Sequence, residues 1–172
     1  MEETIHFMFT GGTIDSFYNG AKDSVETSKE SSIPNFLGSL KLFEKLEFST
    51  ICMKDSRSLT MEDRGKLLQA IQDSPHKKII VTHGTYTMPD TARFLEANLG
   101  NHDKTIILTA SMIPLMGFAP SDAPFNLGFS VAKVLELDSC IRVCMNGKTF
   151  EPNEVVKIIE EGRFDSVFNN KQ

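Results

Sequence analysis

The chain has no excess of positive charge. Its 172 residues include 18 Lys and Arg against 23 Asp and Glu, which gives a formal net charge of -5. The lysines are dispersed along the chain, and neither an acidic nor a basic tail is present. Because a nucleic-acid surface needs a basic patch or stripe, we expect no nucleic-acid partner.

Long apolar runs are also missing. No stretch approaches the roughly 20 apolar residues that cross a bilayer, so we expect no membrane association. The N-terminus, Met1-Glu2-Glu3, is acidic and lacks the basic start and apolar run of a secretory signal. Cysteine is scarce, and Cys52, Cys140 and Cys144 fit neither a C-x-x-C redox motif nor a zinc site. We expect reduced, mostly buried thiols and a cytoplasmic location.

Motifs for metals and cofactors are absent as well. No second histidine stands at ligand spacing from His83, since His6, His76 and His102 are scattered, so we predict no metal site. The glycines form no G-x-G-x-x-G motif, and no G-K-[ST] follows them, so we expect no nucleotide loop and no cofactor.

What is present is the composition of one globular unit. With 40% apolar and 24% charged residues, the chain is long enough for one sizeable core and too short for two. It shows no internal repeat, low-complexity tract or domain linker, so we expect a single domain over residues 1–172. The one long polar loop, Lys22 to Ser32, is rich in Ser and Lys and is expected to be mobile.

Short β-branched runs alternate with segments of helical period. The expected strands are Ile5 to Phe9, Phe48 to Met53, Lys78 to Thr82, Thr105 to Ala110 and Ile141 to Met145. The expected helices are Ile33 to Phe43, Met61 to Gln72, Pro89 to Leu99, Ala123 to Leu135 and Asn153 to Glu161. Thr60 and Asp63 stand at capping-box spacing. The alternation predicts an α/β fold, a three-layer Rossmann-like or flavodoxin-like domain whose mostly parallel sheet has helices on both faces.

Polar residues follow the ends of these strands. In open α/β sheets, ligands bind beyond the carboxyl ends of the strands. The segments that fall there are Thr10-Gly11-Gly12-Thr13, Asp55-Ser56-Arg57, His83-Gly84-Thr85-Tyr86 and Ser111, and Lys157 is expected at the start of, or within, the last helix. One rim therefore collects several hydroxyls, an arginine and a lysine.

Each of these pieces also has an ordinary structural interpretation. Gly11-Gly12 fits a tight turn, because glycine adopts positive φ without strain. The segment from His83 to Thr87 can be explained largely by structure: a turn at Gly84, a helix cap at Thr87 and a buried, hydrogen-bonded imidazole at His83. Lys157 alone is typical of a solvated helix lysine.

Six ordered motifs nevertheless span the chain. They are T-G-G-T-I at Thr10 to Ile14, D-S-x-x-L-T at Asp55 to Thr60, H-G-T-x-T-M with T-A-x-F-L at His83 to Leu95, A-S-M-x-P at Ala110 to Pro114, S-D-A-P-F-N-L at Ser121 to Leu127, and M-N with a later lysine at Met145 to Lys157. In this order and spacing the chain resembles the bacterial-type L-asparaginase family.

The resemblance implies catalytic and binding roles. Thr13 corresponds to the family's nucleophile, Thr85 to its second catalytic threonine and Lys157 to the lysine that serves it. Ser56 corresponds to a binder of the substrate's α-carboxylate, and Ser111 to a residue whose backbone carbonyl lines the amide pocket.

The chemistry explains why such residues gather. Amide hydrolysis by a hydroxyl needs a base, oxyanion donors and an acid for the departing ammonia. A lysine serves as base only if burial or nearby positive charge lowers its pKa. Backbone N–H groups around Gly12 and Thr85 are the expected oxyanion donors, and Gly84, next to Thr85, is a candidate substrate-binding residue. We therefore predict an amidohydrolase that releases ammonia from a small side-chain amide or amino-acid-like ligand through a threonine acyl-enzyme. Thr13 and Thr85 are the candidate nucleophiles, and Lys157 is the candidate base.

The chain departs from the family pattern at two pocket positions. Tyr86, bulky and neutral at pH 7, stands where the family has the aspartate that binds the substrate's ammonium. Arg57 replaces a neutral glutamine-like binder with a positive fork suited to carboxylate or phosphate. Together the changes add about two positive charge units. We expect a ligand more anionic than asparagine or without a free α-ammonium. The family's lid tyrosine has no clear counterpart, since Glu26 falls near its place and Tyr18 lies closer to Thr13.

Length is a third departure. Family members are roughly twice as long, and their C-terminal domain, usually donated by a neighbouring subunit, supplies a glutamate and part of the pocket wall. We expect that domain to be absent from this chain, which is either a natural single-domain homologue or a piece of a longer protein. Tyr86 and the missing domain favour one alternative to catalysis, a silent binding or regulatory domain, and a structural scaffold is a further alternative. The apolar loop Leu115, Met116, Phe118 and Ala119 fits either a homodimer contact or a cover for the domain's own core.

Overall fold

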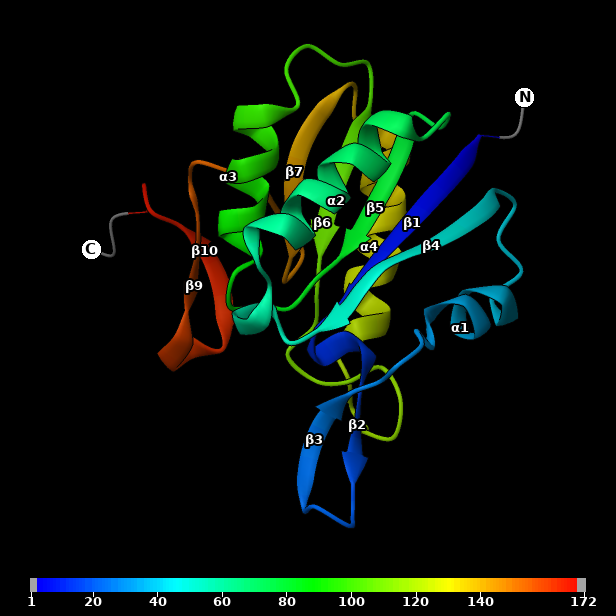
Figure 1. Cartoon of the computed structure of the whole chain (residues 1–172), viewed down its shortest axis with the longest axis vertical. Helices are drawn as coiled ribbons and strands as arrows, with labels where there is room; N and C mark the ends of the chain where they lie inside the picture. The colour runs from blue at the N-terminus through cyan, green and yellow to red at the C-terminus, as the bar shows by residue number, and fades with distance from the viewer. Residues whose placement is uncertain (1–2, 170–172) are drawn as a thin grey trace.

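The structure, a computed structural model, describes residues 3–169. Its centre is a six-stranded sheet in the order β4-β1-β5-β6-β7-β8 (Figure 1). These strands are β1 (Thr4–Gly11), β4 (Lys45–Lys54), β5 (Lys78–Thr82), β6 (Thr105–Thr109), β7 (Cys140–Met145) and β8 (Lys148–Phe150). All pairings are parallel except that of β8 with β7.

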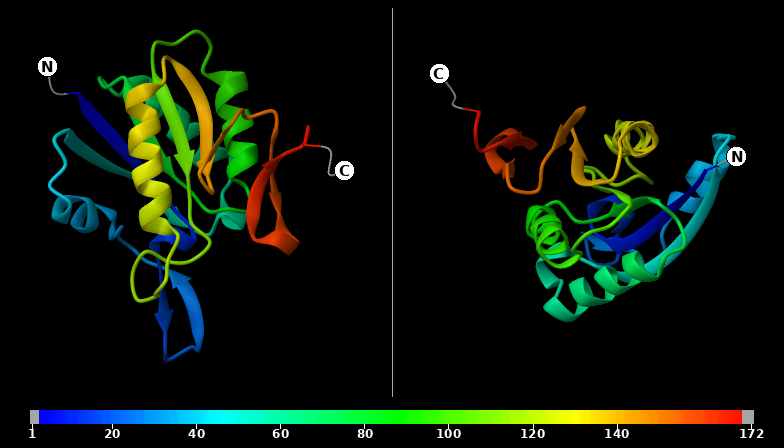
Figure 2. Two further views of the ribbon diagram at one scale, coloured as in Figure 1. Left: turned by 180° about the vertical axis from the view of Figure 1, so that it is seen from behind. Right: turned by 90° about the horizontal axis from the view of Figure 1, so that it is seen from above.

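Helices cover both faces of the sheet, as the alternating pattern predicts. They are α1 (Ile33–Ser39), α2 (Met61–Asp73), α3 (Met88–Asn98) and α4 (Ala123–Glu136). Helices α2 and α3 lie on one face, and α1 and α4 lie on the other (Figure 2). The predicted three-layer α/β fold is therefore confirmed.

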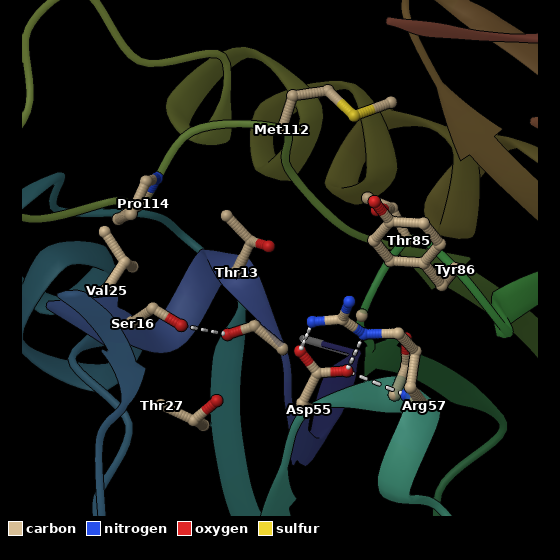
Figure 3. Close-up of a pocket in the computed structure, with 13 residues that line it drawn as sticks. Thr13, Ser16, Val25, Thr27, Asp55, Arg57, Thr85, Tyr86, Met112 and Pro114 are labelled. Atoms are coloured by element: carbon tan, nitrogen blue, oxygen red, sulfur yellow. Dashed lines mark hydrogen bonds and ion pairs between the residues drawn. The ribbon is translucent and has the colours of Figure 1, made fainter. Parts of the chain in front are cut away.

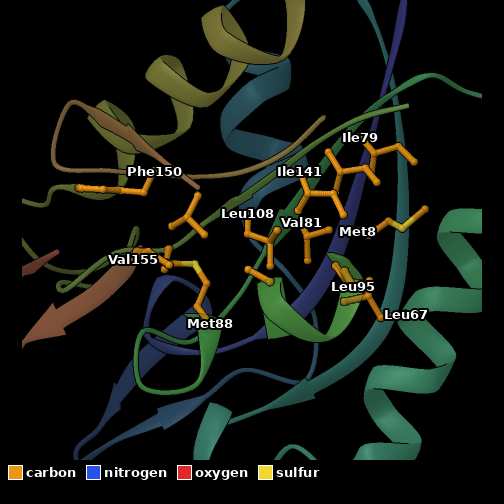
Figure 4. Packing of buried hydrophobic residues seen from close by; sticks show 14 of the residues in the cluster. Met8, Leu67, Ile79, Val81, Met88, Leu95, Leu108, Ile141, Phe150 and Val155 are labelled. Carbon is orange, nitrogen blue, oxygen red and sulfur yellow. The ribbon is translucent and has the colours of Figure 1, made fainter. Parts of the chain in front are cut away.

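The core consists of two apolar layers separated by the sheet. Val81, Leu95 and Leu108 belong to the layer under α2 and α3 (Figure 4). Ile80 and Ile107, the neighbours of Val81 and Leu108 along their strands, belong to the layer under α1 and α4. Strands β5 and β6 are apolar on both faces because both faces are covered.

Two segments differ from the expected secondary structure. The polar loop Lys22 to Ser32 contains strand β3 (Ser24–Thr27), which pairs with β2 (Ser16–Asn19) in a hairpin that projects beyond the sheet (Figure 1). The predicted helix Asn153 to Glu161 is wrong. The chain there forms strand β9 (Val155–Ile158) and a single 3-10 turn (Ile159–Glu161).

Strand β9 forms because it has a partner later in the chain. It pairs antiparallel with β10 (Arg163–Ser166), and the connection turns at Gly162, whose φ of 60° is left-handed. Val155, Val156 and Ile158 are β-branched and suit this pairing. Lys157 is consequently a strand residue opposite Phe164 rather than a residue of a helix.

The other differences are small. Helix α1 ends at Ser39 rather than Phe43, since Lys41 has a left-handed φ of 56°.

The three cysteines are free, and only Cys144 is fully buried, while Cys52 and Cys140 are half-buried. Burial raises the pKa of Cys144 to about 11. Within residues 3–169, no helix is long and apolar enough to cross a bilayer.

The predicted capping box at the start of α2 is present. The Thr60 hydroxyl accepts from the Asp63 N–H at 3.2 Å, and the Thr60 N–H donates to Asp63 at 2.9 Å. Lys54, at the end of β4, donates to both oxygens of Asp63 at 2.8 Å. These contacts lower the pKa of Asp63 to about 2, with the Lys54 bond the largest cause. They also hold together the two ends of the loop that carries Ser56 and Arg57.

We predict that Asp63→Asn destabilises the protein at neutral pH by about 1 kcal/mol, the usual cost of a lost helix cap. The pKa of Asp63 is lower in the folded state, so its contribution is complete above the unfolded value of 3.8 and is lost as pH falls toward 2. Denaturant unfolding at pH 7, 4 and 2.5 measures this. A stability difference that stays constant across the three pH values would contradict the assignment.

Candidate active site

Three loops meet at the carboxyl edge of the sheet. Gly12 follows β1, Ser56 follows β4 and Gly84 follows β5, and these strands are neighbours in the sheet. A Cβ placed on Gly12 would lie 2.4 Å from the Gly84 Cα, and a Cβ on Gly84 would lie 2.6 Å from the Ser56 Cβ. The loops therefore pack backbone against backbone, and the close approach explains both glycines.

A pocket of about 330 Å³ lies at this junction (Figure 3). Seven of its lining residues are among those selected from the sequence, namely Gly12, Thr13, Ser56, Arg57, Gly84, Thr85 and Tyr86. The remaining lining residues are Ser16, Val25, Thr27, Asp55, Met112 and Pro114. Val25 and Thr27 come from the β2–β3 hairpin, so this hairpin forms one wall.

Lys157 reaches Thr85 from the neighbouring hairpin. Its Nζ donates to the Thr85 Oγ1 at 2.8 Å, and Thr85 is only 3% exposed. Burial, and then the positive charge of Arg57, lower the pKa of Lys157 below its usual value. A half-buried lysine bonded to a buried hydroxyl is the arrangement that a general base requires.

Tyr86 forms a wall beside this pair. The Lys157 Nζ lies 3.9 Å from the centre of the Tyr86 ring, and the Arg57 guanidinium carbon lies 4.8 Å from it. Both distances suit cation–π contacts. The ring, 49% exposed, thus lies against both cations of the site.

Arg57 is not a free positive fork in the structure. Its Nε and Nη2 donate to the two carboxylate oxygens of Asp55 at 3.0 and 2.8 Å. This bond is the largest cause that lowers the pKa of Asp55. The sequence places Asp55 on the same rim as Arg57 but does not assign it a role, and its pairing with Arg57 was not predicted, although the two residues are only two positions apart.

Thr13 begins the short 3-10 turn Thr13–Asp15 and is half-buried. Within the described part of the chain its hydroxyl has no hydrogen-bond partner, whereas the neighbouring Ser16 hydroxyl donates to the Gly12 carbonyl at 2.9 Å. The structure thus places Thr13 in the pocket of Thr85 but gives the lysine contact to Thr85 alone.

Ser111 lies outside the pocket lining. It is fully buried, and its hydroxyl donates to the Ile113 carbonyl at 2.5 Å. The next residue, Met112, lines the pocket and donates its N–H to Asp122, which anchors the loop to the start of α4. The structure therefore brings the Ser111 loop to the site but directs its side chain elsewhere.

Two other sequence candidates are structural. Tyr18 lies on the hairpin, donates to Asp23 at 2.6 Å and does not line the pocket. His83 is fully buried between the Gly84 carbonyl and the Thr91 hydroxyl, at 2.8 and 2.9 Å, and burial lowers its pKa to about 4. His83 is therefore a neutral imidazole with both ring nitrogens hydrogen-bonded, which agrees with a structural role. No cluster of possible metal ligands occurs within residues 3–169.

Residues 4–169 match the family described as Asparaginase, N-terminal. The chain belongs to the asparaginase family. It is 34% identical over 110 residues to a glutaminase-asparaginase of Acinetobacter glutaminasificans, and this alignment covers 59% of the chain and 32% of that relative. It is 33% identical over 81 residues to L-asparaginase 2 of Escherichia coli (strain K12), covering 45% and 23% of the two chains.

Solved structures of this family share the fold. The thermostable L-asparaginase from Thermococcus kodakarensis superposes with a TM-score of 0.85 at 26% identity, covering 97% of this chain and 52% of that one. A probable cytoplasmic L-asparaginase from Campylobacter jejuni gives 0.84 at 24% identity, covering 98% and 54%. The asparaginase-family chain therefore spans about half of these structures, and about a third or less of the two relatives above.

The glycine contacts predict a steric effect at the centre of this site. Gly84→Ala is expected to cost about 1–3 kcal/mol, because its Cβ meets the backbone and Cβ of Ser56. The matched control is Gly65→Ala in α2, where nothing lies within 4 Å; it is expected to gain about 0.5–1 kcal/mol. Denaturant unfolding compares them, and equal stability of the two variants would contradict the close packing.

The charge of Arg57 predicts a shift in the titration of Lys157. Arg57→Gln is expected to raise the pKa of Lys157 toward its usual value, because it removes a nearby positive charge. NMR titration of 13C-methylated lysines measures this, with Lys157→Arg to assign the signal. Arg57→Lys keeps the charge, and Arg163→Gln removes a cation elsewhere, so neither variant is expected to raise the pKa of Lys157 as much as Arg57→Gln does. An unchanged pKa in Arg57→Gln would contradict the coupling.

Proposed function

We propose that the chain is an amidohydrolase resembling L-asparaginase, which releases ammonia from a small side-chain amide through a threonine nucleophile. The observation that carries the proposal is the 2.8 Å bond from the Lys157 Nζ to the buried Thr85 hydroxyl, in a pocket that Thr13 also lines. The family assignment and the names of its relatives support the same chemistry.

The proposed reaction has two halves. Thr13 attacks the amide carbonyl carbon, its proton passes through the Thr85 and Lys157 pair to the amide nitrogen, and the carbon–nitrogen bond breaks to release ammonia. Water then attacks the ester on Thr13, gives its proton to the same pair, and releases the carboxylic acid while the threonine hydroxyl re-forms. Backbone N–H groups at the Gly12 and Gly84 loops are the candidate donors to the oxyanion.

Specific contacts also favour a second candidate function, a binding or regulatory domain without turnover. Tyr86 lies against Lys157 at 3.9 Å, and the Thr13 hydroxyl has no base in contact among the described residues. In this alternative the pocket binds a small molecule but Thr13 is never activated. A structural scaffold, by contrast, predicts no saturable ligand binding.

We further propose that residues 1–172 form one domain of the family and that the chain is cytoplasmic. Free thiols support that location, and one similar structure is titled cytoplasmic, although a relative from Haemophilus influenzae is described as periplasmic. A homodimer is the proposed assembly. Met116 is 55% exposed and is therefore available for a dimer contact, while Leu115 is buried and covers the domain's own core.

The function is tested by ammonia release from asparagine, glutamine and amides with a blocked or missing α-amino group. The wild-type chain is expected to release ammonia from at least one of them. Thr13→Ala and Lys157→Met are expected to lose on the order of a hundredfold or more in kcat, because each removes a reacting group. Thr13→Ser keeps a hydroxyl and is the matched control, expected to retain measurable turnover and to form an ester detectable by mass spectrometry.

Two results would contradict the proposed reaction. If wild type and Thr13→Ala release ammonia equally, Thr13 is not the nucleophile. If wild type binds an amide but turns over none, and Tyr86→Asp gains activity, the silent binding domain is the better description.

A further inference from the structure

The pocket offers no unpaired carboxylate. Asp55 is the only acidic side chain among the described residues that line it. Its Oδ1 accepts the Arg57 backbone N–H at 2.8 Å and the Arg57 Nε at 3.0 Å, while its Oδ2 accepts Nη2 at 2.8 Å. Both oxygens are therefore engaged by a neighbouring residue of the same loop. A ligand ammonium in the pocket would have to compete with a two-point guanidinium bond.

Nearby acidic groups outside the lining are paired as well. Glu26, on the β2–β3 hairpin, binds Lys22 at 2.8 Å and Asn19 at 3.1 Å. Asp63, below the Ser56 loop, binds Lys54. These two acids thus already have partners. Asp15, two residues after Thr13, does not line the pocket; its Oδ1 accepts from Ser31 and Ser32, its buried Oδ2 has no hydrogen-bond partner among the described residues, and burial raises its pKa, which favours the uncharged form.

Donors for an anion, in contrast, remain available. Arg57 uses Nε and Nη2 for Asp55, and its Nη1 has no hydrogen-bond partner within the described residues. The Ser56 hydroxyl is buried, lines the pocket and accepts the Thr87 N–H at 3.4 Å, which leaves its own proton to donate. Arg57 and Ser56 are adjacent in the chain, so a carboxylate can reach both.

The Tyr86 wall strengthens this preference. Lys157 and Arg57 both lie against its ring, and Asp55 offsets part of the Arg57 charge, so a ligand group beside Tyr86 lies near positive charge and near no unpaired carboxylate of the lining. An ammonium there loses water and meets like charge without compensation, whereas a neutral or apolar group loses little. The phenol ring also fills space with a surface that suits a methylene or an acyl group.

We infer that the substrates of this site are small amides that carry a carboxylate but no free α-ammonium, the class of monoamides of dicarboxylic acids and of N-acylated amino-acid amides. This inference rests on the proposed amidohydrolase function. The carboxylate binds Arg57 and Ser56, the amide carbonyl faces Thr13, and the carbon that bears the ammonium in asparagine faces Tyr86.

Succinamate and L-asparagine form the matched pair that tests it. They have the same carboxylate and the same side-chain amide, and they differ only in the α-ammonium. For the unmodified chain, kcat/KM for succinamate is expected to exceed that for asparagine by roughly tenfold or more. N-acetyl-asparagine, which also lacks a free ammonium, is expected to have a kcat/KM closer to that of succinamate. Calorimetric Kd values for both ligands on Thr13→Ala measure the same preference without turnover.

Variants at Tyr86 separate charge from shape. Tyr86→Asp adds a carboxylate where the ammonium of asparagine would lie and is expected to reduce or reverse the preference by about tenfold. Tyr86→Asn removes the same ring and adds no charge, so the preference for succinamate is expected to persist. If Tyr86→Asp and Tyr86→Asn change the succinamate-to-asparagine ratio of kcat/KM equally, the ring rather than the charge sets the selectivity, and the inference is wrong.

Failure of the inference and failure of the function are distinguishable. If asparagine is hydrolysed as well as or better than succinamate, and Thr13→Ala abolishes that turnover, the function stands and the substrate class is overturned. If neither amide is hydrolysed, the Kd values decide: tighter binding of succinamate supports the selectivity, while tighter binding of asparagine, equal binding or no binding of either refutes it.

Discussion

The site depends on a contact between backbones. Strand β1 lies between β4 and β5, so the loops that follow these three strands are neighbours by topology. Neighbouring loops normally stay apart by the width of their side chains. Here Gly12 and Gly84 have no Cβ, and the loops approach until an added Cβ would lie 2.4–2.6 Å from the facing atoms. Thr13, Ser56 and Thr85 are each within one residue of this contact, so their hydroxyls share one pocket only because the backbones touch.

Lys157, the proposed base, contacts Thr85 from outside the main sheet. Lys157 lies on β9, and the Arg93 side chain of α3 donates to the Val155 carbonyl at 2.9 Å. On the other strand of the hairpin, the Phe164 N–H donates to Asn146 at 2.9 Å, after β7. These bonds join the hairpin to the body of the domain at both strands. A lysine on an isolated helix would gain no comparable anchor, and the position of its amine would be set mainly by its own rotamers.

The parts of the fold that could be predicted are those with local causes. Strands β5 and β6 are apolar runs that only a sheet covered on both faces can bury, and Thr60 with Asp63 is a cap decided within four residues. Strand β9 has no such local cause. Its conformation is decided by pairing with residues 163–166 across a left-handed turn, which a window of sequence does not contain. The ion pair of Arg57 with Asp55 is local, yet it was not predicted, because the sequence places both residues on the rim without fixing the rotamers that bring the guanidinium to the carboxylate.

Arg57 influences both the ligand and the base, and the two effects have the same sign. Its bond to Asp55 removes the carboxylate that a ligand ammonium would need, while its charge still helps to lower the pKa of Lys157. An aspartate in place of Tyr86 would act in the opposite direction on both, because a carboxylate within about 4–6 Å favours the ammonium of a ligand and of a lysine alike. In the proposed reaction, a pocket with Arg57 and Tyr86 therefore disfavours an α-ammonium and, by the same electrostatics, keeps Lys157 easier to deprotonate. The inferred selectivity against the ammonium and the proposed role of Lys157 as base then have one cause, the distribution of charge in the site.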